Sequence, residues 1–388
     1  MKAVIIAAVD PILSFIRARQ GEMIATIRGF VECESPSDDP AAVNRFVELV
    51  ADTVAPFAAV RTFGGGHFGK HLVCSMRLPG RKKNGSRILA LGHSDTVWSL
   101  GTLRSMPFRQ ADGRLFGPGV YDMKAGIVFF LFAVRALCEL EIPVPSRVLL
   151  QLNSDEEVGS ESSRALTEKH ATQSHAVLVL EPGTGRTGKL KTARKGVGGF
   201  TVTVRGRASH AGLDYEAGAS AILELSHQIT RIAGLTDLRR GITLNPGLIS
   251  GGTRSNVVAA EACAEIDIRV RRQRDAEALE KKLRALRPID PRCSIEITGG
   301  LNRPPMERSA GTVRLFRTAR KLAAELGIDL EESISGGGSD GNFTAALGIP
   351  TLDGLGAVGE GAHAINESIL LDRMADRTAL LAKLLAAL

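Results

Sequence analysis

Imidazole and carboxylate side chains follow two of the apolar runs in this sequence. His93 and Asp95 form an H-x-D motif directly after "RILALG", and "LLQLNS" leads into Asp155, Glu156 and Glu157. Three adjacent carboxylates at the end of a buried element cost free energy unless a cation or hydrogen bonds compensate their charge. This segment therefore raises the question of a bound cation.

Three further residues of the same chemical types stand near other apolar runs. Asp122 lies in "GPGVYDMKAG", Glu181 in "LEPG" and His363 in "GEGAHA". Two imidazoles and three carboxylates without cysteine suit zinc or another first-row divalent ion better than calcium. Five ligands exceed the need of one catalytic zinc, so two ions sharing a carboxylate are the simplest arrangement. Such a pair activates water and polarises a carbonyl group, while a spare carboxylate transfers the proton.

Each residue taken alone also has a purely structural explanation. His93 could be a hydrogen-bonded histidine of the core, and Asp122 could cap the helix that follows it. Glu156 and Glu157 could begin a solvated helix, because acidic residues are favoured near helix N-termini. The metal hypothesis therefore depends on all five sites occurring together.

The expected secondary structure would bring these residues to one place. Segments 87–95, 147–157 and 175–182 have the pattern of buried strands, and residues 22–31 and 41–60 have helical periodicity. The apolar segment "MKAGIVFFLFAVRALCEL" predicts a helix buried against a sheet. This alternation predicts an α/β fold. The carboxyl ends of parallel strands share one edge of such a sheet, where ligands bind.

The middle of the chain has a different pattern. Residues 195–304 have the order β-α-β-β-α-β, which is typical of a small α+β domain. A helix at 310–326 and the glycine-rich "SGGGSDGN" then return to the first domain. We therefore predict a catalytic domain formed by residues 1–194 and 305–388, with 195–304 inserted into it.

Composition argues against several other classes of protein. The chain has 388 residues, 44% hydrophobic and 23% charged, which suits two globular domains. Five scattered cysteines without a CxxC pair argue against disulfides and thiolate zinc sites. The net charge of +7 is dispersed and aromatic residues make up 4%, so we expect an acidic small substrate and no nucleic acid.

Hydropathy also indicates whether the chain spans a membrane and where in the cell it is located. The longest apolar run, 127–134, is too short to cross a bilayer, so no membrane partner is expected. The N-terminal run 4–9 lacks a convincing cleavage site. These features predict a cytoplasmic protein, with a weak N-terminal export signal as the alternative.

The motifs H-x-D, D-M-K-x-G, D-E-E, E-P and a late G-x-H, around an inserted α+β domain, resemble the M20 family of dinuclear zinc metallopeptidases and deacylases. The resemblance covers residues 22–388 and is greatest to the glutamate carboxypeptidases, the carboxypeptidase G type. It implies a mixed-sheet catalytic domain with two Zn2+ per subunit, replaceable by Co2+ or Mn2+. It also implies that the inserted domain forms a homodimer.

The resemblance further implies roles for individual residues. The metal ligands correspond to His93, Asp122, Glu157, Glu181 and His363. Asp122 would be shared between the two ions, and Asp95 would orient His93. Glu156 corresponds to the general base, which takes a proton from water and passes it to the leaving amine. Met123 departs from close relatives, which often have a second Asp here, although Asp-Met also occurs among the deacylases.

Other correspondences concern substrate binding. His210 in "GRASHAG" matches a histidine that stabilises the oxyanion in the active site of the neighbouring subunit. The cations that bind substrate carboxylates correspond to Lys189 and Arg303. Other substrate-contacting positions correspond to Asn256 and Arg269. A glycine-rich wall of the pocket corresponds to Gly337 and Gly338. Arg suits a terminal carboxylate because its planar fork donates two parallel hydrogen bonds.

We therefore expect a metal-dependent hydrolase that cleaves the amide bond of N-acyl or peptidyl amino acids and preferentially releases C-terminal glutamate. The alternatives are a deacylase like acetylornithine deacetylase or succinyl-diaminopimelate desuccinylase, and a dipeptidase. A binding protein on the same scaffold would be expected to have lost ligands or the base. The other histidines are expected at the surface or in packing: His67, His71, His170, His175 and His227.

Overall fold

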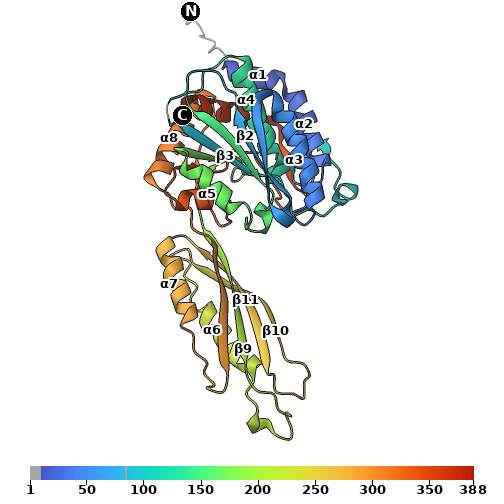
Figure 1. Cartoon of the computed structure of the whole chain (residues 1–388), viewed down its shortest axis with the longest axis vertical. Helices are drawn as coiled ribbons and strands as arrows, with labels where there is room; N and C mark the ends of the chain where they lie inside the picture. Colours follow the sequence, from blue (N-terminus) through green and yellow to red (C-terminus); the bar gives the residue numbers. More distant parts are fainter. Residues whose placement is uncertain (1–9, 84) are drawn as a thin grey trace, which may run out of the picture. The chain divides into compact units, whose positions relative to one another are not determined.

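Two compact units make up the chain in a computed structural model that describes residues 10–83 and 85–388 (Figure 1). Unit 1 contains the chain up to Ala193 together with Arg308–Ser335 and Ser339–Leu388, and unit 2 contains Arg194–Glu307 and Gly336–Gly338. The sequence assigned these three glycines to the catalytic domain, whereas their contacts place them in unit 2.

A six-stranded mixed sheet forms the centre of unit 1, in the order β1-β2-β6-β3-β7-β14 (Figure 1). The strands are β1 Ala58–Gly64, β2 Lys70–Met76, β3 Arg87–His93, β6 Arg147–Asn153, β7 Ala176–Val179 and β14 Thr351–Leu352. β2 is antiparallel to both of its neighbours, and β6, β3, β7 and β14 are parallel. The three strands predicted from the sequence are therefore adjacent, with β3 in the middle.

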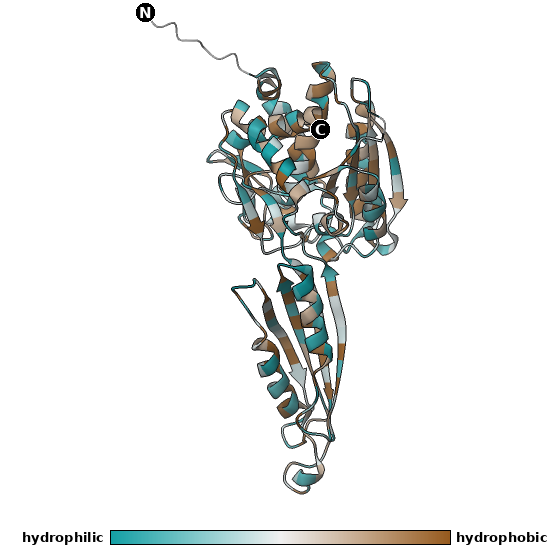
Figure 2. Ribbon diagram, turned by 90° about the vertical axis from the view of Figure 1, so that its left-hand side faces the viewer, coloured by the Kyte–Doolittle hydropathy of each residue, from teal (hydrophilic) through white to brown (hydrophobic). Residues whose placement is uncertain are grey.

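Alternate residues of the strands pack into two hydrophobic cores, one on each face of the sheet. Ile88 and Ala90 belong to the larger core, and Leu89 and Leu91 belong to the smaller one. The larger core includes residues of α1 Pro11–Ala18, α2 Gln20–Glu32, α3 Pro40–Val54, α4 Ala125–Glu139, α8 Ala310–Glu325 and α10 Met374–Ala387. On the other face lie α5 Arg164–Thr172 and α9 Gly341–Ala346. Figure 2 shows hydrophobic residues concentrated on the strands of this sheet, and the predicted α/β class is confirmed.

Helix boundaries follow the sequence expectations with one exception. The apolar segment after Asp122 forms α4, which is buried on nearly every side as predicted. The helix predicted for 41–60 ends earlier, at Val54. Pro56 follows, and Ala58–Gly64 then join the sheet as its edge strand β1. Apolar residues at the end of a helix and in a short edge strand give similar patterns, which explains the wrong boundary.

A smaller sheet in unit 1 joins segments that are distant in sequence. Its order is β15-β16-β5-β4. The strands are β4 Arg109–Ala111, β5 Arg114–Phe116, β15 Gly359–Glu360 and β16 Ser368–Leu370, and a separate pair is formed by β8 Leu190–Arg194 and β13 Glu332–Ser335. Because β16 pairs with β5, the loop that carries His363 lies beside the segment that leads to Asp122.

Unit 2 is an antiparallel four-stranded sheet with two helices, in the predicted chain order β-α-β-β-α-β. The sheet order is β10-β11-β9-β12. The elements are β9 Gly196–Arg205, α6 Ala221–Ala233, β10 Thr243–Gly251, β11 Glu261–Val270, α7 Gln273–Arg284 and β12 Ser294–Arg303. The two ends of this unit lie side by side, since Val197 pairs with Arg303 and Arg194 exchanges two backbone hydrogen bonds with Met306.

Within residues 10–83 and 85–388, no helix is long and apolar enough to cross a membrane. The apolar run 4–9 lies outside the described residues.

Candidate metal centre

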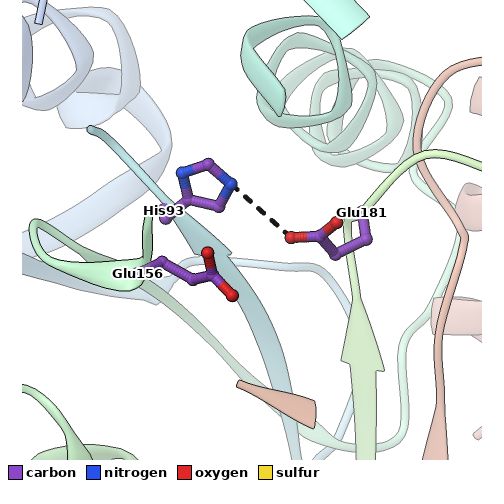
Figure 3. A group of neighbouring side chains, drawn as sticks. All are labelled: His93, Glu156 and Glu181. Carbon is purple, nitrogen blue, oxygen red and sulfur yellow. Dashed lines mark ion pairs between the residues drawn. The ribbon is translucent and has the colours of Figure 1, made fainter. Parts of the chain in front are cut away.

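The carboxyl ends of three parallel strands deliver the first group of candidate ligands. His93 is the last residue of β3 and pairs with Asn153, the last residue of β6, so the loop with Glu156 begins beside His93. Glu181 follows β7 on the other side of β3. Figure 3 shows His93, Glu156 and Glu181 converging from these three strand ends, with His93 Nε2 3.5 Å from Glu181 Oε1.

Asp122 lies between the two predicted histidine ligands. Its Oδ1 atom is 3.3 Å from His93 Nε2, and its Oδ2 atom is 3.5 Å from His363 Nε2. Glu157 Oε2 approaches His363 Nε2 to 3.2 Å, while Glu181 approaches His93. The five residues therefore form two groups, His93 with Glu181 and His363 with Glu157, and each group faces one oxygen of Asp122.

Glycines allow the segment around Asp122 to approach the strand ends. A Cβ atom on Gly126, in the first turn of α4, would lie 2.2 Å from the backbone oxygen of Leu180, so only glycine fits there. The start of α4 thereby packs directly against the residue before Glu181. Gly119 adopts φ 72°, a left-handed conformation that favours glycine, and the Asp122–Met123 peptide bond is cis.

The electrostatics of the site is dominated by negative charge. Burial disfavours protonated His93, but hydrogen bonds to Asp122, Asp95 and Glu181 outweigh burial and raise the pKa of His93 well above its ordinary value. Hydrogen bonds to Asp122 and Glu157 raise the pKa of His363 to about 10. Burial opposes ionisation of Asp122, yet the two imidazoles hold its pKa well below the ordinary range. The carboxylates thus favour positive charge at this place, which protons or a metal cation can supply.

The donor set fits divalent metal ions. Nitrogen and oxygen donors without sulfur, on groups that must be deprotonated to bind, are typical ligands of zinc and neighbouring first-row ions. The ligand atoms of His93, Asp122 and Glu157 all lie within 4.8 Å of one another, as do those of His93, Glu156 and Glu181. Glu157 Oε1 is buried and has no hydrogen-bond partner among the described residues, as expected for an oxygen that a cation would satisfy.

Asp95 supports both sides of the site. His93 Nδ1 donates to the backbone oxygen of Asp95 at 2.9 Å, which leaves Nε2 directed at Asp122. The Asp95 carboxylate accepts the backbone N–H of Glu156 at 3.2 Å and of Glu157 at 3.1 Å. It also accepts the Ser37 hydroxyl at 2.8 Å. This one carboxylate therefore fixes a histidine ring and the backbone of two glutamates.

Asp155 and His71 support the loop beside the ligand groups. Asp155, the first of the three consecutive acids, uses its Oδ2 to accept the N–H and the hydroxyl of Ser162, each at 2.7 Å. His71, expected at the surface or in packing, is a buried packing residue. Its Nδ1 accepts the Ser154 N–H at 3.2 Å, and its Nε2 lies 3.1 Å from Ser162 Oγ. These residues hold the loop that carries Glu156 and Glu157.

Sequence reasoning missed Glu367, which is fully buried and accepts the backbone N–H of Asp122 at 3.0 Å. Its only sequence signal is an acidic residue four positions after His363, and nothing distinguishes that pattern from a solvated loop.

Unit 2 brings two of the predicted substrate residues together. His210 is exposed, and its Nδ1 accepts the backbone N–H groups of Gly212 and Leu213, each at 3.1 Å. The backbone oxygen of Asn256 accepts the N–H of Ala211, so Asn256 lies in the adjacent turn. Arg269, at the opposite end of β11, is ion-paired with Asp267 at 2.9 Å.

The remaining predicted residues fall into two places. Arg303 is buried at the end of β12 against Gly338, where a Cβ atom would lie 2.9 Å from Arg303 Cδ. Arg194 donates to the backbone oxygens of Gly337 at 3.1 Å and Gly338 at 2.9 Å, a contact that the sequence did not predict. Lys189 belongs to unit 1 and forms an ion pair with Glu331 at 3.0 Å.

Imidazole and carboxylate donors at the carboxyl edge of a mixed α/β sheet define a metallohydrolase. The model of peptidase family M20/M25/M40 matches residues 89–387, and the chain belongs to this family. It is therefore a metallopeptidase, a hydrolase that acts on peptide bonds.

Individual relatives agree with this assignment. Carboxypeptidase G2 from Pseudomonas sp. (strain RS-16) is 30% identical over 352 residues, which are 89% of this chain and 83% of that protein. Succinyl-diaminopimelate desuccinylase from Acidovorax ebreus is 28% identical over 307 residues, or 73% of this chain and 76% of that protein. The crystal structure of aminopeptidase PepT from Bacillus cereus shares the fold, with a TM-score of 0.81, 23% identity and coverage of 95% and 98% of the two chains.

Proposed function

We propose that this metallopeptidase uses two divalent metal ions, zinc in the first place, to hydrolyse the amide bond of N-acyl or peptidyl amino acids and release C-terminal glutamate. The observation that carries the two-ion site is the Asp122 carboxylate, whose oxygens lie 3.3 Å from His93 Nε2 and 3.5 Å from His363 Nε2. Glu181 and Glu157 would complete the two sets of ligands. Co2+ and Mn2+ are expected to replace zinc because the donor set is the same.

Glu156 is the proposed general base. Bound metal ions would polarise the scissile carbonyl and lower the pKa of a water molecule. Glu156 lies beside His93 and Glu181 and would take the proton from that water and return it to the leaving nitrogen. The Asp95 carboxylate holds the Glu156 backbone in place through the 3.2 Å hydrogen bond.

His210 is the proposed oxyanion donor. Because its Nδ1 accepts two backbone N–H groups, a neutral ring carries its proton on Nε2, which can donate to a developing oxyanion. The proposal is that unit 2 of one subunit supplies this group to the active site of its partner in a homodimer.

An apolar edge of unit 2 supports the homodimer proposal. β10 is an edge strand of the sheet, and its residues Leu248 and Ile249 are each 64% exposed. Exposed apolar edge strands pair readily with another strand. Ile249→Lys is expected to give monomers in sedimentation analysis, and Ile289→Lys, on an exposed apolar residue elsewhere in unit 2, is the control. Unchanged dimers in the first variant would exclude this edge as the interface.

The substrate class rests on charge and on the relationship to carboxypeptidase G2. The chain carries a net charge of +7, which favours acidic substrates. Arg303 has the planar fork that suits a substrate carboxylate, whereas Lys189 would have to exchange its ion pair with Glu331 for substrate. A deacylase of the desuccinylase type is the second candidate, because such enzymes are also relatives and because Met123 follows Asp122 in the D-M-K sequence.

Identification of the amino acid released from a panel of N-acyl amino acids and dipeptides tests the proposal. Zinc-loaded protein is expected to release glutamate from acyl-glutamates, and chelated protein is expected to release none. Arg303→Ala should raise KM for acyl-glutamates, while Arg292→Ala, which removes an exposed arginine paired with Asp290 in the same unit, should not. Preferential release of diaminopimelate or ornithine would replace glutamate by the deacylase alternative.

A further inference from the structure

One buried carboxylate outside the predicted ligand set has an unusual set of partners. The Glu367 side chain is fully buried in unit 1 and accepts four N–H groups. Oε1 accepts from the backbone of Tyr121 at 2.9 Å and of Asp122 at 3.0 Å. Oε2 accepts from the backbone of Gly119 at 2.9 Å and from the indole of Trp98 at 2.7 Å.

These four hydrogen bonds use the acceptor positions of the carboxylate. An ionised carboxylate offers about four lone-pair sites. Each oxygen of Glu367 accepts two donors, so neither oxygen is directed at a metal ion. The negative charge is compensated by N–H dipoles, and no ion pair to Glu367 occurs within the described part of the chain. Glu367 is therefore distinct from the ligand carboxylates Asp122, Glu157 and Glu181.

Glu367 and its hydrogen-bond partners belong to three segments, and each segment carries one residue of the proposed metal site. Trp98 lies in the segment that follows β3 and His93. The Gly119–Asp122 turn carries the carboxylate that lies between the histidines. Glu367 itself closes the turn after His363, because its own N–H donates to the backbone oxygen of Ala364 at 2.9 Å. The three segments meet at one side chain.

We propose that Glu367 is a positioning residue that fixes the Asp122 backbone relative to His93 and His363, and so holds the Asp122 carboxylate where it would bind metal. This inference rests on the proposed two-ion function. Outer hydrogen bonds of this kind orient metal ligands and typically change metal affinity by about 10- to 100-fold when they are lost. In Glu367→Gln the amide NH2 would oppose two N–H donors, which displaces the Gly119–Asp122 turn while the volume of the side chain stays the same.

The test measures zinc affinity by competition with a chromophoric chelator, and the visible spectrum of the cobalt-substituted protein. Glu367→Gln is expected to lower zinc affinity by about 10- to 100-fold and to change the cobalt spectrum. Asp376→Asn is the matched control. It alters a largely buried carboxylate of the same unit whose ion-pair partner, Arg373, lies outside the three segments, and it should leave both readouts unchanged.

A purely structural role would lower the melting temperature of the metal-free protein and leave zinc affinity and the cobalt spectrum as in the wild type. That result overturns the proposal. If Glu367→Gln does not fold, Trp98→Phe removes one of the four donors and retains an aromatic ring, and it should weaken zinc binding in the same direction by a smaller factor. Unchanged zinc affinity in folded Trp98→Phe would then overturn the proposal. Failure of the wild type to bind zinc would instead refute the metal centre itself.

Discussion

Asp95→Asn is a sharp perturbation because Asp95 accepts hydrogen bonds at both oxygens. Oδ1 accepts the Glu156 N–H at 3.2 Å, and Oδ2 accepts the Glu157 N–H at 3.1 Å and the Ser37 hydroxyl at 2.8 Å. Whichever way the new amide is oriented, its NH2 group replaces an acceptor and faces a backbone donor. The substitution therefore removes at least one hydrogen bond to a charged group next to the proposed base or ligand.

The expected magnitude follows from the value of one such bond. A hydrogen bond to a charged group contributes about 1.5–3 kcal/mol, which corresponds to roughly 10- to 100-fold in an equilibrium constant. We expect Asp95→Asn to lower zinc affinity by about this factor, because Glu157 and His93 both depend on Asp95 for their positions. With zinc at saturation, kcat should still be reduced because the Glu156 backbone is no longer held.

Zinc affinity by chelator competition and kcat at saturating zinc separate these two effects. Asp38→Asn is the control, since Asp38 is an exposed carboxylate of the same segment as Ser37 and undergoes the same loss of charge. Wild-type zinc affinity together with wild-type kcat in Asp95→Asn would refute the role assigned to this carboxylate.

Three other predictions concern the base, the dimer and the buried histidine. Glu156→Gln should keep its metal content and lose about 100- to 10,000-fold in kcat, because the proton carrier is removed but no ligand is lost. His210→Ala should lower kcat with the dimer intact, and mixing it with Glu156→Gln should restore part of the activity in heterodimers. Burial lowers the pKa of His71 below 6.5 against the opposing influence of Asp155, Asp340 and Asp95. The metal-free protein should therefore lose stability as the pH falls from 6.5 through the lowered pKa of His71 in the folded state. His71→Gln should show a flatter dependence of melting temperature on pH.

Each of these predictions has its own control. Glu161→Gln, on an exposed glutamate of the following loop, should retain full activity. If mixing restores no activity although heterodimers are verified, His210 does not act in the active site of the partner subunit. For His71, the unfolded chain accepts a proton near pH 6.5 whereas the folded protein resists it, so the stabilisation is complete above that pH. The exposed His67, changed to Gln, should leave the pH dependence unaltered.

The proximity of His93, Glu157 and Glu181 could be predicted because they lie at or just after the carboxyl ends of adjacent parallel strands. Their roles as metal ligands stay a prediction that the resemblance implies. Glu367 and His71 could not be predicted, because their roles depend on backbone N–H groups and hydroxyls that the folded turns alone bring within reach. The contact of Arg194 with Gly337 and Gly338 is of the same kind. The early end of the helix at Val54 was missed because a short edge strand continues the apolar pattern of α3.

The two ends of unit 2 are adjacent, and this affects how the domain composition of the protein can change in evolution. Because Arg194 and Met306 are hydrogen-bonded neighbours, the chain leaves unit 1 and returns to it at nearly the same point. More than a hundred residues of unit 2 lie between these two positions. A short turn placed between these positions would preserve the path of the chain on either side. Unit 2 can therefore be exchanged for the corresponding unit of a relative as a single insert, while the imidazole and carboxylate groups of unit 1 are inherited unchanged.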